Sequence, residues 1–142
     1  MSNAAAAAAP QPPNPIHNPP PFIYKIVPVA DWEATFEKTG RYTGSELDKK
    51  DGFIHISDRH ATARTIELYY ANQPHIVLVQ LKTAEMLKAG GDKLKWDWVP
   101  SRATYFPHWY DLEAGFTKEF ISRVDKLTYD EAAKKHILPE LQ

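Results

Sequence analysis

The pattern of hydrophobic and polar residues predicts a strand and then a helix where the folded part of the chain begins. Residues 22–27 are almost all aromatic or β-branched, which is typical of a strand. Residues 32–38 place two aromatic side chains four positions apart, on one face of a helix. Asp31 stands where an N-cap residue belongs, and Gly40 stands where a helix commonly ends.

Two further strands, with a helix between them, are predicted next. Residues 53–56 form a short apolar strand with one histidine. Residues 59–72 repeat apolar side chains at helical spacing, with Ser57 or Asp58 as the N-cap residue. Residues 75–81 are nearly all apolar and β-branched, which is typical of a central strand buried on both faces.

Short elements crowd the second half of the chain. The pattern predicts a helix over residues 83–91, extended segments at 94–98 and 103–106, a strand at 120–124 and a helix at 132–136. A capping-box pattern just before the last of these supports that helix. This order favours a single small α+β domain, with a mixed or antiparallel sheet and flanking helices, over a doubly wound fold.

Residues 1–21 differ in composition from the rest. They are Ala, Pro, Asn and Gln almost throughout and contain seven of the 12 prolines. Such a segment buries too little apolar surface to offset its ordering entropy, so we expect a disordered tail there and the domain over residues 22–142. A proline-rich tail can bind a protein module of the SH3 or WW type, or it can be an extension without a partner.

Charge and cysteine content exclude several functions. Lys and Arg number 17 against 18 Asp and Glu, which excludes the strongly basic face of an extended nucleic-acid surface. The absence of cysteine excludes disulfides, cysteine zinc sites and a cysteine nucleophile. No apolar run is long enough to span a membrane, and the N-terminal alanine run lacks the basic residue of a signal peptide, so a cytoplasmic location is expected.

Residues 51–57, Asp-Gly-Phe-Ile-His-Ile-Ser, form the first candidate site. Because side chains alternate along a strand, Phe53, His55 and Ser57 share one face while the other face is aliphatic. Ser57 lies at the predicted start of a helix, where free N–H groups and the helix dipole favour an anion. An anionic or hydroxyl-rich ligand would fit there. Alternatively, His55 is a core histidine and Ser57 only a helix cap.

Residues 106–110, Phe-Pro-His-Trp-Tyr, form the second candidate site. Pro107 stiffens the backbone just before His108. The aromatic rings, including Tyr110, could stack on a planar ligand such as adenine or nicotinamide. Alternatively, Phe106 and Trp109 fill the core and His108 faces solvent.

Other charged residues near these motifs allow two interpretations. Residues 96–98, Trp-Asp-Trp, could form a wall of the site, and Arg102 could bind a phosphate. An ion pair between Asp97 and Arg102 on the surface explains the same charges. Likewise, Asp48 and Asp51 are either turn formers or a general acid and base.

Several established motifs are absent. The chain has no His-Glu-x-x-His, so no metal is expected. It also lacks a P-loop, a G-x-G-x-x-G motif and the G-x-S-x-G elbow of serine hydrolases.

These motifs, in this order over residues 22 to about 125, resemble the DUF952 family. The residues that carry the resemblance are Ile23-Tyr24-Lys25-Ile26, Tyr42-Thr43-Gly44-Ser45, Asp48, Asp51-Gly52-Phe53-Ile54-His55-Ile56-Ser57, Trp96 and Phe106-Pro107-His108-Trp109-Tyr110. The resemblance implies a fold similar to ADP-ribosyltransferases and RNA 2′-phosphotransferases, and NAD is the cofactor that such a fold suggests. It implies no established activity.

The resemblance also implies roles for single residues. In NAD-dependent transferases of that fold, an early-strand histidine or arginine holds the ribose hydroxyls, and His55 resembles it, with Ser57 as the small polar residue that follows. Tyr69, Tyr70 and Tyr110 are candidates for the tyrosine that stacks on nicotinamide. Such enzymes also carry a late-strand glutamate.

That glutamate has no clear counterpart in this chain. Glu119 is the glutamate nearest the last predicted strand, and its surroundings do not match the motif. ADP-ribosyl transfer is therefore doubtful, and a nucleotide binder or other histidine chemistry remains open.

Two functions follow from these motifs. The first is a binder or enzyme, ADP-ribosyl- or phosphate-transferase-like, for a nucleotide-type ligand with ribose or phosphate groups. Its catalytic candidates are His55 and His108, as ligand donors or an acid–base couple, and its ligand-binding candidates are Tyr24, Ser45, Ser57, Arg102 and Tyr110. The second is a non-catalytic protein-interaction domain. The first requires both imidazoles to open into one cleft, and the second requires a closed pocket with each histidine hydrogen-bonded internally.

Overall fold

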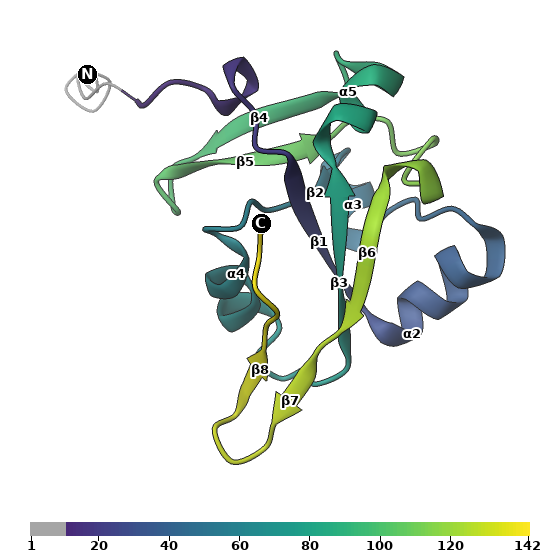
Figure 1. Cartoon of the computed structure of the whole chain (residues 1–142), viewed down its shortest axis with the longest axis vertical. Coiled ribbons are helices and arrows are strands. Elements are labelled where there is room, and N and C mark those ends of the chain that lie inside the picture. The colour runs from purple at the N-terminus through teal and green to yellow at the C-terminus, as the bar shows by residue number, and fades with distance from the viewer. Residues whose placement is uncertain (1–10) are drawn as a thin grey trace.

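The computed structural model describes residues 11–142, which form an α+β fold (Figure 1). In chain order the elements are η1 (Pro15–His17), β1 (Phe22–Pro28), α2 (Val29–Trp32), η2 (Glu33–Glu37), α3 (Glu46–Asp51), β2 (Ile54–His55), α4 (Thr62–Tyr69), β3 (Ile76–Lys82), α5 (Thr83–Gly90), β4 (Leu94–Val99), β5 (Thr104–Trp109), η3 (Lys118–Phe120), β6 (Ile121–Lys126), β7 (Thr128–Asp130) and β8 (Lys135–Ile137). The strands pair antiparallel in the order β1-β3-β6, β2-β5-β4 and β7-β8. The predicted α+β class with an antiparallel sheet is confirmed.

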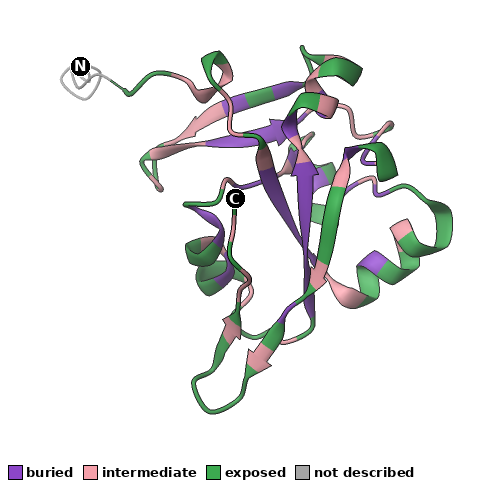
Figure 2. Cartoon of the chain, in the orientation of Figure 1, coloured by how far each residue is buried: buried purple, intermediate pink, exposed green. Residues whose placement is uncertain are grey.

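Strand β3 is the central strand of the first sheet, between β1 and β6. All of its residues except Lys82 are buried, which confirms the strand predicted to be covered on both faces (Figure 2). Alternate residues of β1 enter two separate cores. Ile23 packs with Trp32 of α2 in the main core, and Ile26 packs with Ile66 of α4 in the second core.

A backbone bridge connects the second sheet to the first. Tyr24 of β1 and Ser57, just after β2, exchange two backbone hydrogen bonds of 2.7 and 2.8 Å. Strand β2 pairs with β5 so that His55 lies opposite His108. This bridge and this pairing set the β2–β5 strands against the edge of β1.

The first helical segment begins earlier than the sequence predicts. Helix α2 starts at Val29, directly after Pro28, so Asp31 lies inside the helix and its assignment as N-cap is wrong. Pro28 has a φ of −57°, close to the angle its ring imposes, and it turns the chain from β1 into α2. The predicted shared face is confirmed, because the rings of Trp32 and Phe36 stack at 4.6 Å.

Helix α4 begins later than predicted, at Thr62. The Asp58 carboxylate accepts hydrogen bonds from the backbone N–H groups of His60 and Ala61, which holds a turn before the helix. Ser57 belongs to the bridge with Tyr24 instead of the helix start. The prediction that a helix N-terminus favours an anion at Ser57 is therefore wrong.

The C-terminal helix predicted at residues 132–136 is also wrong, because β7 and β8 form a hairpin there. Thr128, the first residue of the predicted capping box, lies in β7, and Asp130 accepts hydrogen bonds from the N–H groups of Ala132 and Ala133, which hold the turn of the hairpin. Lys134 adopts a left-handed φ of 56°, which a helix does not allow.

Residues 11–21, assigned from composition to a disordered tail, lie against β4 and β5 in the structure. The Asn14 amide donates to the carbonyl of Trp96 at 3.0 Å, and the Tyr105 hydroxyl donates to the carbonyl of Pro12 at 2.8 Å. Ile16 packs against the main core. This contact offsets part of the entropy lost when the segment becomes ordered, which the composition of the segment did not indicate. The rest of the predicted tail, residues 1–10, lies outside the described residues. Among residues 11–142, no helix is long and apolar enough to cross a membrane.

Candidate functional site

The pairing of β2 with β5 brings the two candidate histidines together. The ring centroids of His55 and His108 are 5.5 Å apart, in an edge-to-face arrangement. Phe53 lies beside both, with its ring 4.7 Å from that of His55 and stacked at 4.1 Å on that of His108. Two motifs more than fifty residues apart in sequence therefore form one site.

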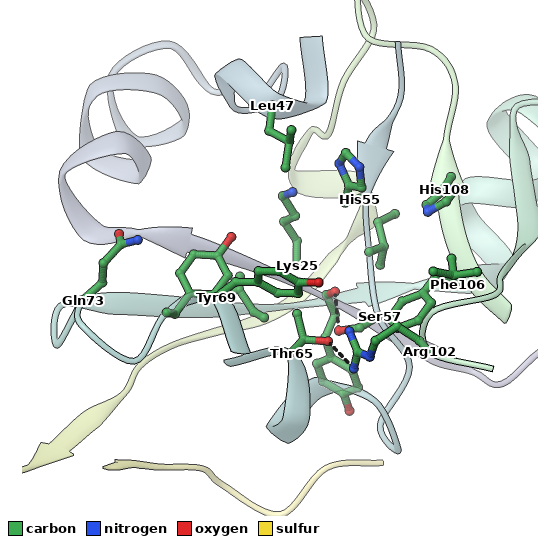
Figure 3. A pocket seen from close by; sticks show the side chains of 15 residues that line it. Lys25, Leu47, His55, Ser57, Thr65, Tyr69, Gln73, Arg102, Phe106 and His108 are labelled. Carbon is green, nitrogen blue, oxygen red and sulfur yellow. Dashed lines mark hydrogen bonds between the residues drawn. The ribbon is translucent and has the colours of Figure 1, made fainter. Parts of the chain in front are cut away.

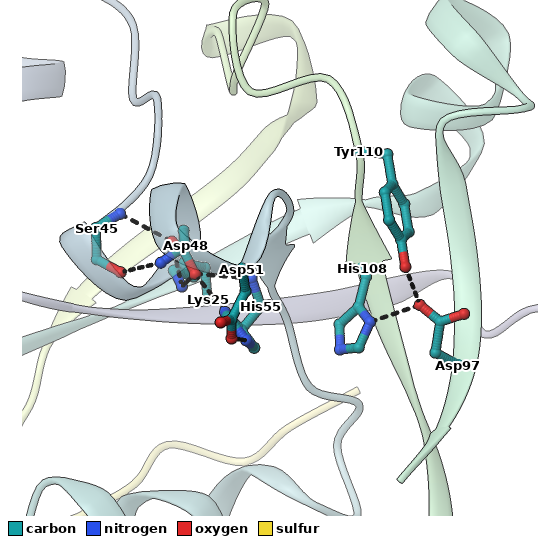
Figure 4. Close-up of polar contacts among 8 residues, drawn as sticks. All are labelled: Lys25, Ser45, Asp48, Asp51, His55, Asp97, His108 and Tyr110. Atoms are coloured by element: carbon teal, nitrogen blue, oxygen red, sulfur yellow. Dashed lines mark hydrogen bonds and ion pairs between the residues drawn. The ribbon is translucent and has the colours of Figure 1, made fainter.

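Asp48 of α3 is the buried anchor of the His55 side of the site (Figure 4). Ser45 caps α3, because its hydroxyl accepts from the Asp48 N–H while its own N–H donates to the Asp48 carboxylate at 2.9 Å. The same carboxylate accepts the backbone N–H of His55 at 3.0 Å and contacts the Nδ1 of His55 at 2.6 Å. Lys25 of β1 completes the cluster with its Nζ 2.9 Å from the carboxylate.

The cluster holds Asp48 ionised. Burial on its own would raise the pKa of Asp48, but the hydrogen bonds from His55 and Ser45 and the charge of Lys25 together hold that pKa well below its ordinary value. Burial lowers the pKa of Lys25, and Asp48 opposes that shift. The ammonium and the carboxylate are thus compensated by each other inside the protein.

His55 lies between two carboxylates. Its Nδ1 faces Asp48, and its Nε2 is 2.9 Å from the carboxylate of Asp51, whose side chain is 37% exposed. Both contacts are hydrogen bonds only when both ring nitrogens carry protons. Both ring nitrogens of His55 therefore face carboxylates inside the protein.

His108 has different surroundings. Its Nδ1 is 2.7 Å from the carboxylate of Asp97 on β4, and the Tyr110 hydroxyl donates to the same oxygen at 2.5 Å (Figure 4). Burial lowers the pKa of His108 although Asp97 opposes the shift, and burial with the Asp97 bond raises the pKa of Tyr110 to about 12. With the proton on Nδ1, the Nε2 of neutral His108 is an acceptor, and no residue in the range 11–142 hydrogen-bonds to it.

A cavity of about 430 Å³ opens beside the two histidines (Figure 3). The predicted site residues that line it are Tyr24, His55, Ser57, Arg102 and His108. Its remaining walls are largely apolar, with Leu47 and Tyr69, 56% and 63% exposed, at its rim. Of the tyrosines proposed to stack on a ligand, Tyr69 and Tyr70 line the cavity and Tyr110 does not.

Four of the predicted ligand-binding residues have roles within the fold. Ser45 caps α3, and the Tyr110 hydroxyl binds Asp97, so neither lines the cavity. The Tyr24 hydroxyl donates to Gln80 at 3.1 Å, which leaves part of its ring on the cavity wall. The hydroxyl of Ser57 lies 2.9 Å from that of Thr62.

The predicted surface pair between Asp97 and Arg102 does not form. Asp97 contacts His108 and Tyr110 instead. The guanidinium of Arg102 donates to the Thr65 hydroxyl at 3.1 Å and lies 4.8 Å above the ring of Phe106.

The aromatic residues near Asp97 divide between core and site. Trp96 and Trp109 belong to the main core, so Trp96 is not a wall of the cavity. His108 is 6% exposed and does not face bulk solvent. The alternative for this motif is therefore confirmed for Trp109 and wrong for His108, and Phe106 is buried but lines the cavity.

Sequence reasoning missed Lys25, underestimated Asp48 and gave Asp97 the wrong partner, Arg102 instead of His108. Lys25 is the single charged residue in an otherwise apolar strand, and a buried lysine requires a counter-charge. That was a usable signal for Lys25, although it did not name the partner. Glu119, the glutamate considered for a transferase role, does not line the cavity. Within residues 11–142, no group of three or more His, Asp or Glu side chains is arranged to hold a metal ion.

Each of the two functional hypotheses meets part of its geometric requirement. His55 and His108 line one cavity, as a ligand-handling site requires. Each histidine also has an internal carboxylate partner, as the interaction domain requires. The pocket itself is open at its rim, which differs from the closed pocket of the second hypothesis.

Comparison with known proteins gives a family and a solved relative. The family model described as "Protein of unknown function (DUF952)" matches residues 26–121. The chain is similar to the crystal structure of protein CC0527 from Caulobacter crescentus, with 29% sequence identity and a TM-score of 0.69. The match covers 82% of this chain and 93% of the CC0527 chain. The solution NMR structure of CC0527 is 30% identical, with a TM-score of 0.64, covering 80% and 90%. No curated protein matches the chain. Because the family model spans more than half of its length, the chain belongs to the DUF952 family.

Proposed function

We propose that this protein binds a nucleotide-type ligand, with ribose or phosphate groups, in the cavity beside His55 and His108. The observation that carries the proposal is the Nε2 of His108, an acceptor without a hydrogen-bond partner among residues 11–142, on a cavity that His55 also lines. Both ring nitrogens of His55 already face carboxylates, so the His55 ring contributes to the cavity wall. A ribose hydroxyl can donate a hydrogen bond to the Nε2 of His108.

The shape and lining of the cavity support the same class of ligand. A volume of about 430 Å³ with mostly apolar walls is typical of a small-molecule site. Tyr69 at the rim offers an aromatic face on which a nucleobase can stack. His108 and Ser57 are buried and the Tyr69 ring is exposed at the rim, which suits a ligand with a sugar at one end and a flat ring at the other.

The proposal includes the relationship to ADP-ribosyltransferases and RNA 2′-phosphotransferases that the family resemblance implies. It does not include ADP-ribosyl transfer, since Glu119 lies outside the cavity. If the site is catalytic, His55 and His108 are the residues placed to exchange protons with a ligand. NAD and 2′-phosphorylated ribonucleotides therefore belong in the first set of ligands to test.

A thermal-shift panel tests the proposal. NAD, ADP-ribose, the four ribonucleoside monophosphates and 2′-phosphorylated ribonucleotides are added to wild type, His108→Ala and His60→Ala. A ligand at about 100 times its Kd stabilises the native state by about 2.7 kcal/mol, a readily measured shift. We expect that shift in wild type and in His60→Ala, whose imidazole is exposed and outside the cavity, and its loss in His108→Ala.

The same panel addresses the interaction domain. The internal hydrogen bonds of both histidines favour that alternative. If no compound shifts the unfolding temperature of wild type, the ligand-binding proposal fails and the interaction domain becomes the better hypothesis.

A further inference from the structure

The charged groups that line the cavity are all basic. Lys25 and Arg102 are its charged residues, with His55 and His108 beside them, and no Asp or Glu lines it. The Lys25 ammonium is compensated by Asp48. Arg102 forms no ion pair with any carboxylate among residues 11–142. The cavity therefore presents one uncompensated guanidinium to a ligand.

The local fold fixes the position of Arg102. It lies in the turn between β4 and β5, where its N–H donates to the carbonyl of Val99 at 3.0 Å. The next residue, Ala103, takes a left-handed φ of 51°, which reverses the chain into β5.

The guanidinium itself is held at two points. One N–H donates to the Thr65 hydroxyl on α4, and the Cζ atom lies over the ring of Phe106 (Figure 3). Thr65 is fixed in turn, because its hydroxyl donates to the carbonyl of Ala61 at 2.9 Å. The remaining N–H groups of Arg102 have no partner among the described residues, so the fork is oriented before any ligand arrives.

We infer that Arg102, positioned by Thr65 and Phe106, is an anion subsite that takes the phosphate of a phosphorylated nucleoside. The inference rests on the proposed function and deepens it by naming which chemical group lies at which end of the cavity. The phosphate lies at the turn between β4 and β5, and the ribose hydroxyls lie at His108. A guanidinium in a partly buried cavity binds phosphate oxygens through charge-assisted, often bidentate hydrogen bonds, which a neutral nucleoside cannot replace.

Calorimetric titration of the full chain with AMP, GMP, CMP and UMP, and with the four matching nucleosides, tests the subsite. In wild type, a nucleotide should bind roughly tenfold to a hundredfold more tightly than its nucleoside, the range expected for a hydrogen-bonded charged group. In Arg102→Gln this difference should vanish while nucleoside affinity stays at its wild-type value. Arg64→Gln is the matched control, since Arg64 precedes Thr65 on α4 but is exposed and pairs with Glu67.

Wild type alone provides a second measurement, independent of how any variant folds. Raising the salt concentration should weaken nucleotide binding and leave nucleoside binding nearly unchanged, because salt screens the phosphate–guanidinium attraction. The subsite would be contradicted if nucleotide and nucleoside bound with equal affinity, or if nucleotide affinity did not change with salt concentration. The proposed function would not be contradicted by either result. If neither class binds, the subsite fails, and the proposed function fails with it when no compound of the thermal-shift panel binds either.

Discussion

His55 and His108 are direct cross-strand neighbours, and each is held by a different carboxylate. Asp48 holds the Nδ1 of His55 from helix α3, and Asp97 holds the Nδ1 of His108 from strand β4. The second nitrogen of His55 is also occupied, by Asp51, whereas that of His108 is left for a ligand. The two rings therefore differ in what they offer to a bound molecule.

Replacing Asp48 with Asn should destabilise the fold strongly. The substitution removes the charge that compensates buried Lys25, and breaking a buried pair in this way costs about 3–5 kcal/mol. Urea unfolding of wild type and Asp48→Asn measures the loss. Asp51→Asn is the control, because a partly exposed contact contributes at most about 1 kcal/mol. Equal losses in the two variants would contradict the anchoring role of Asp48.

The loss of stability in acid should also depend on the Asp48 carboxylate. The pKa of Asp48 is lowered in the folded protein, so its contribution is complete above the unfolded value of 3.8 and is lost as the pH falls through the folded value. In Asp48→Asn, the free energy of unfolding should lack this part of its decrease in acid. Unfolding free energies measured from pH 6 downward in both proteins provide the comparison.

His108 should give the protein a second pH dependence, nearer neutrality. Its pKa is lowered in the folded state, so below the unfolded value of 6.5 the unfolded chain binds a proton that the folded protein resists. Stability should therefore decrease as the pH falls from 7.5 through 6.5, and less so in His108→Gln. In His60→Gln, an exposed position, the wild-type pH dependence should persist. An unchanged slope in His108→Gln would contradict the assignment.

Asp97 should control both the pKa and the tautomer of His108. Asp97 raises the pKa of His108 against the effect of burial, so Asp97→Asn should lower that pKa further. NMR titration of the imidazole resonances measures this shift, and nitrogen chemical shifts report the loss of the Nδ1-protonated form. Asp92→Asn, an exposed site, is the matched control. A higher pKa in Asp97→Asn would contradict the geometry.

Tyr69 should contribute to ligand affinity without contributing much to stability. Its side chain is 63% exposed at the rim of the cavity, and base–aromatic stacking is worth about 1–3 kcal/mol. Tyr69→Ala should therefore weaken nucleotide binding about fivefold or more at a nearly unchanged unfolding temperature. Leu68→Ala, the exposed neighbour outside the cavity lining, should leave binding at its wild-type level. If Tyr69→Ala and Leu68→Ala bound the nucleotide with equal affinity, Tyr69 would not be part of the ligand site.

Local patterns in the sequence were sufficient where neighbouring residues decide the structure. The four-residue spacing of Trp32 and Phe36 predicts one shared helical face, and the two rings stack at 4.6 Å. The apolar run before Lys82 predicts the buried central strand β3. Alternation along the strand predicts that Phe53 and His55 share a face, and their rings are 4.7 Å apart.

Contacts between distant segments could not be predicted in the same way. The pairing of Lys25 with Asp48 joins two elements that carry no shared local signal. The register that sets His55 opposite His108 depends on how β2 meets β5, which neither motif encodes alone. Near the C-terminus, residues 128–131 match a capping-box pattern, but Thr128 lies in strand β7 and Asp130 holds a turn by accepting from the N–H groups of Ala132 and Ala133.

The Asp48 carboxylate closes the capping box of α3 and also receives the backbone and ring of His55. Fraying of that short helix would therefore also release the His55 imidazole. The stability of α3 and the position of His55 in the cavity wall are thus coupled. A molecule that occupies the cavity should slow hydrogen–deuterium exchange at the amides of Ser45 and His55, even though Ser45 does not line it.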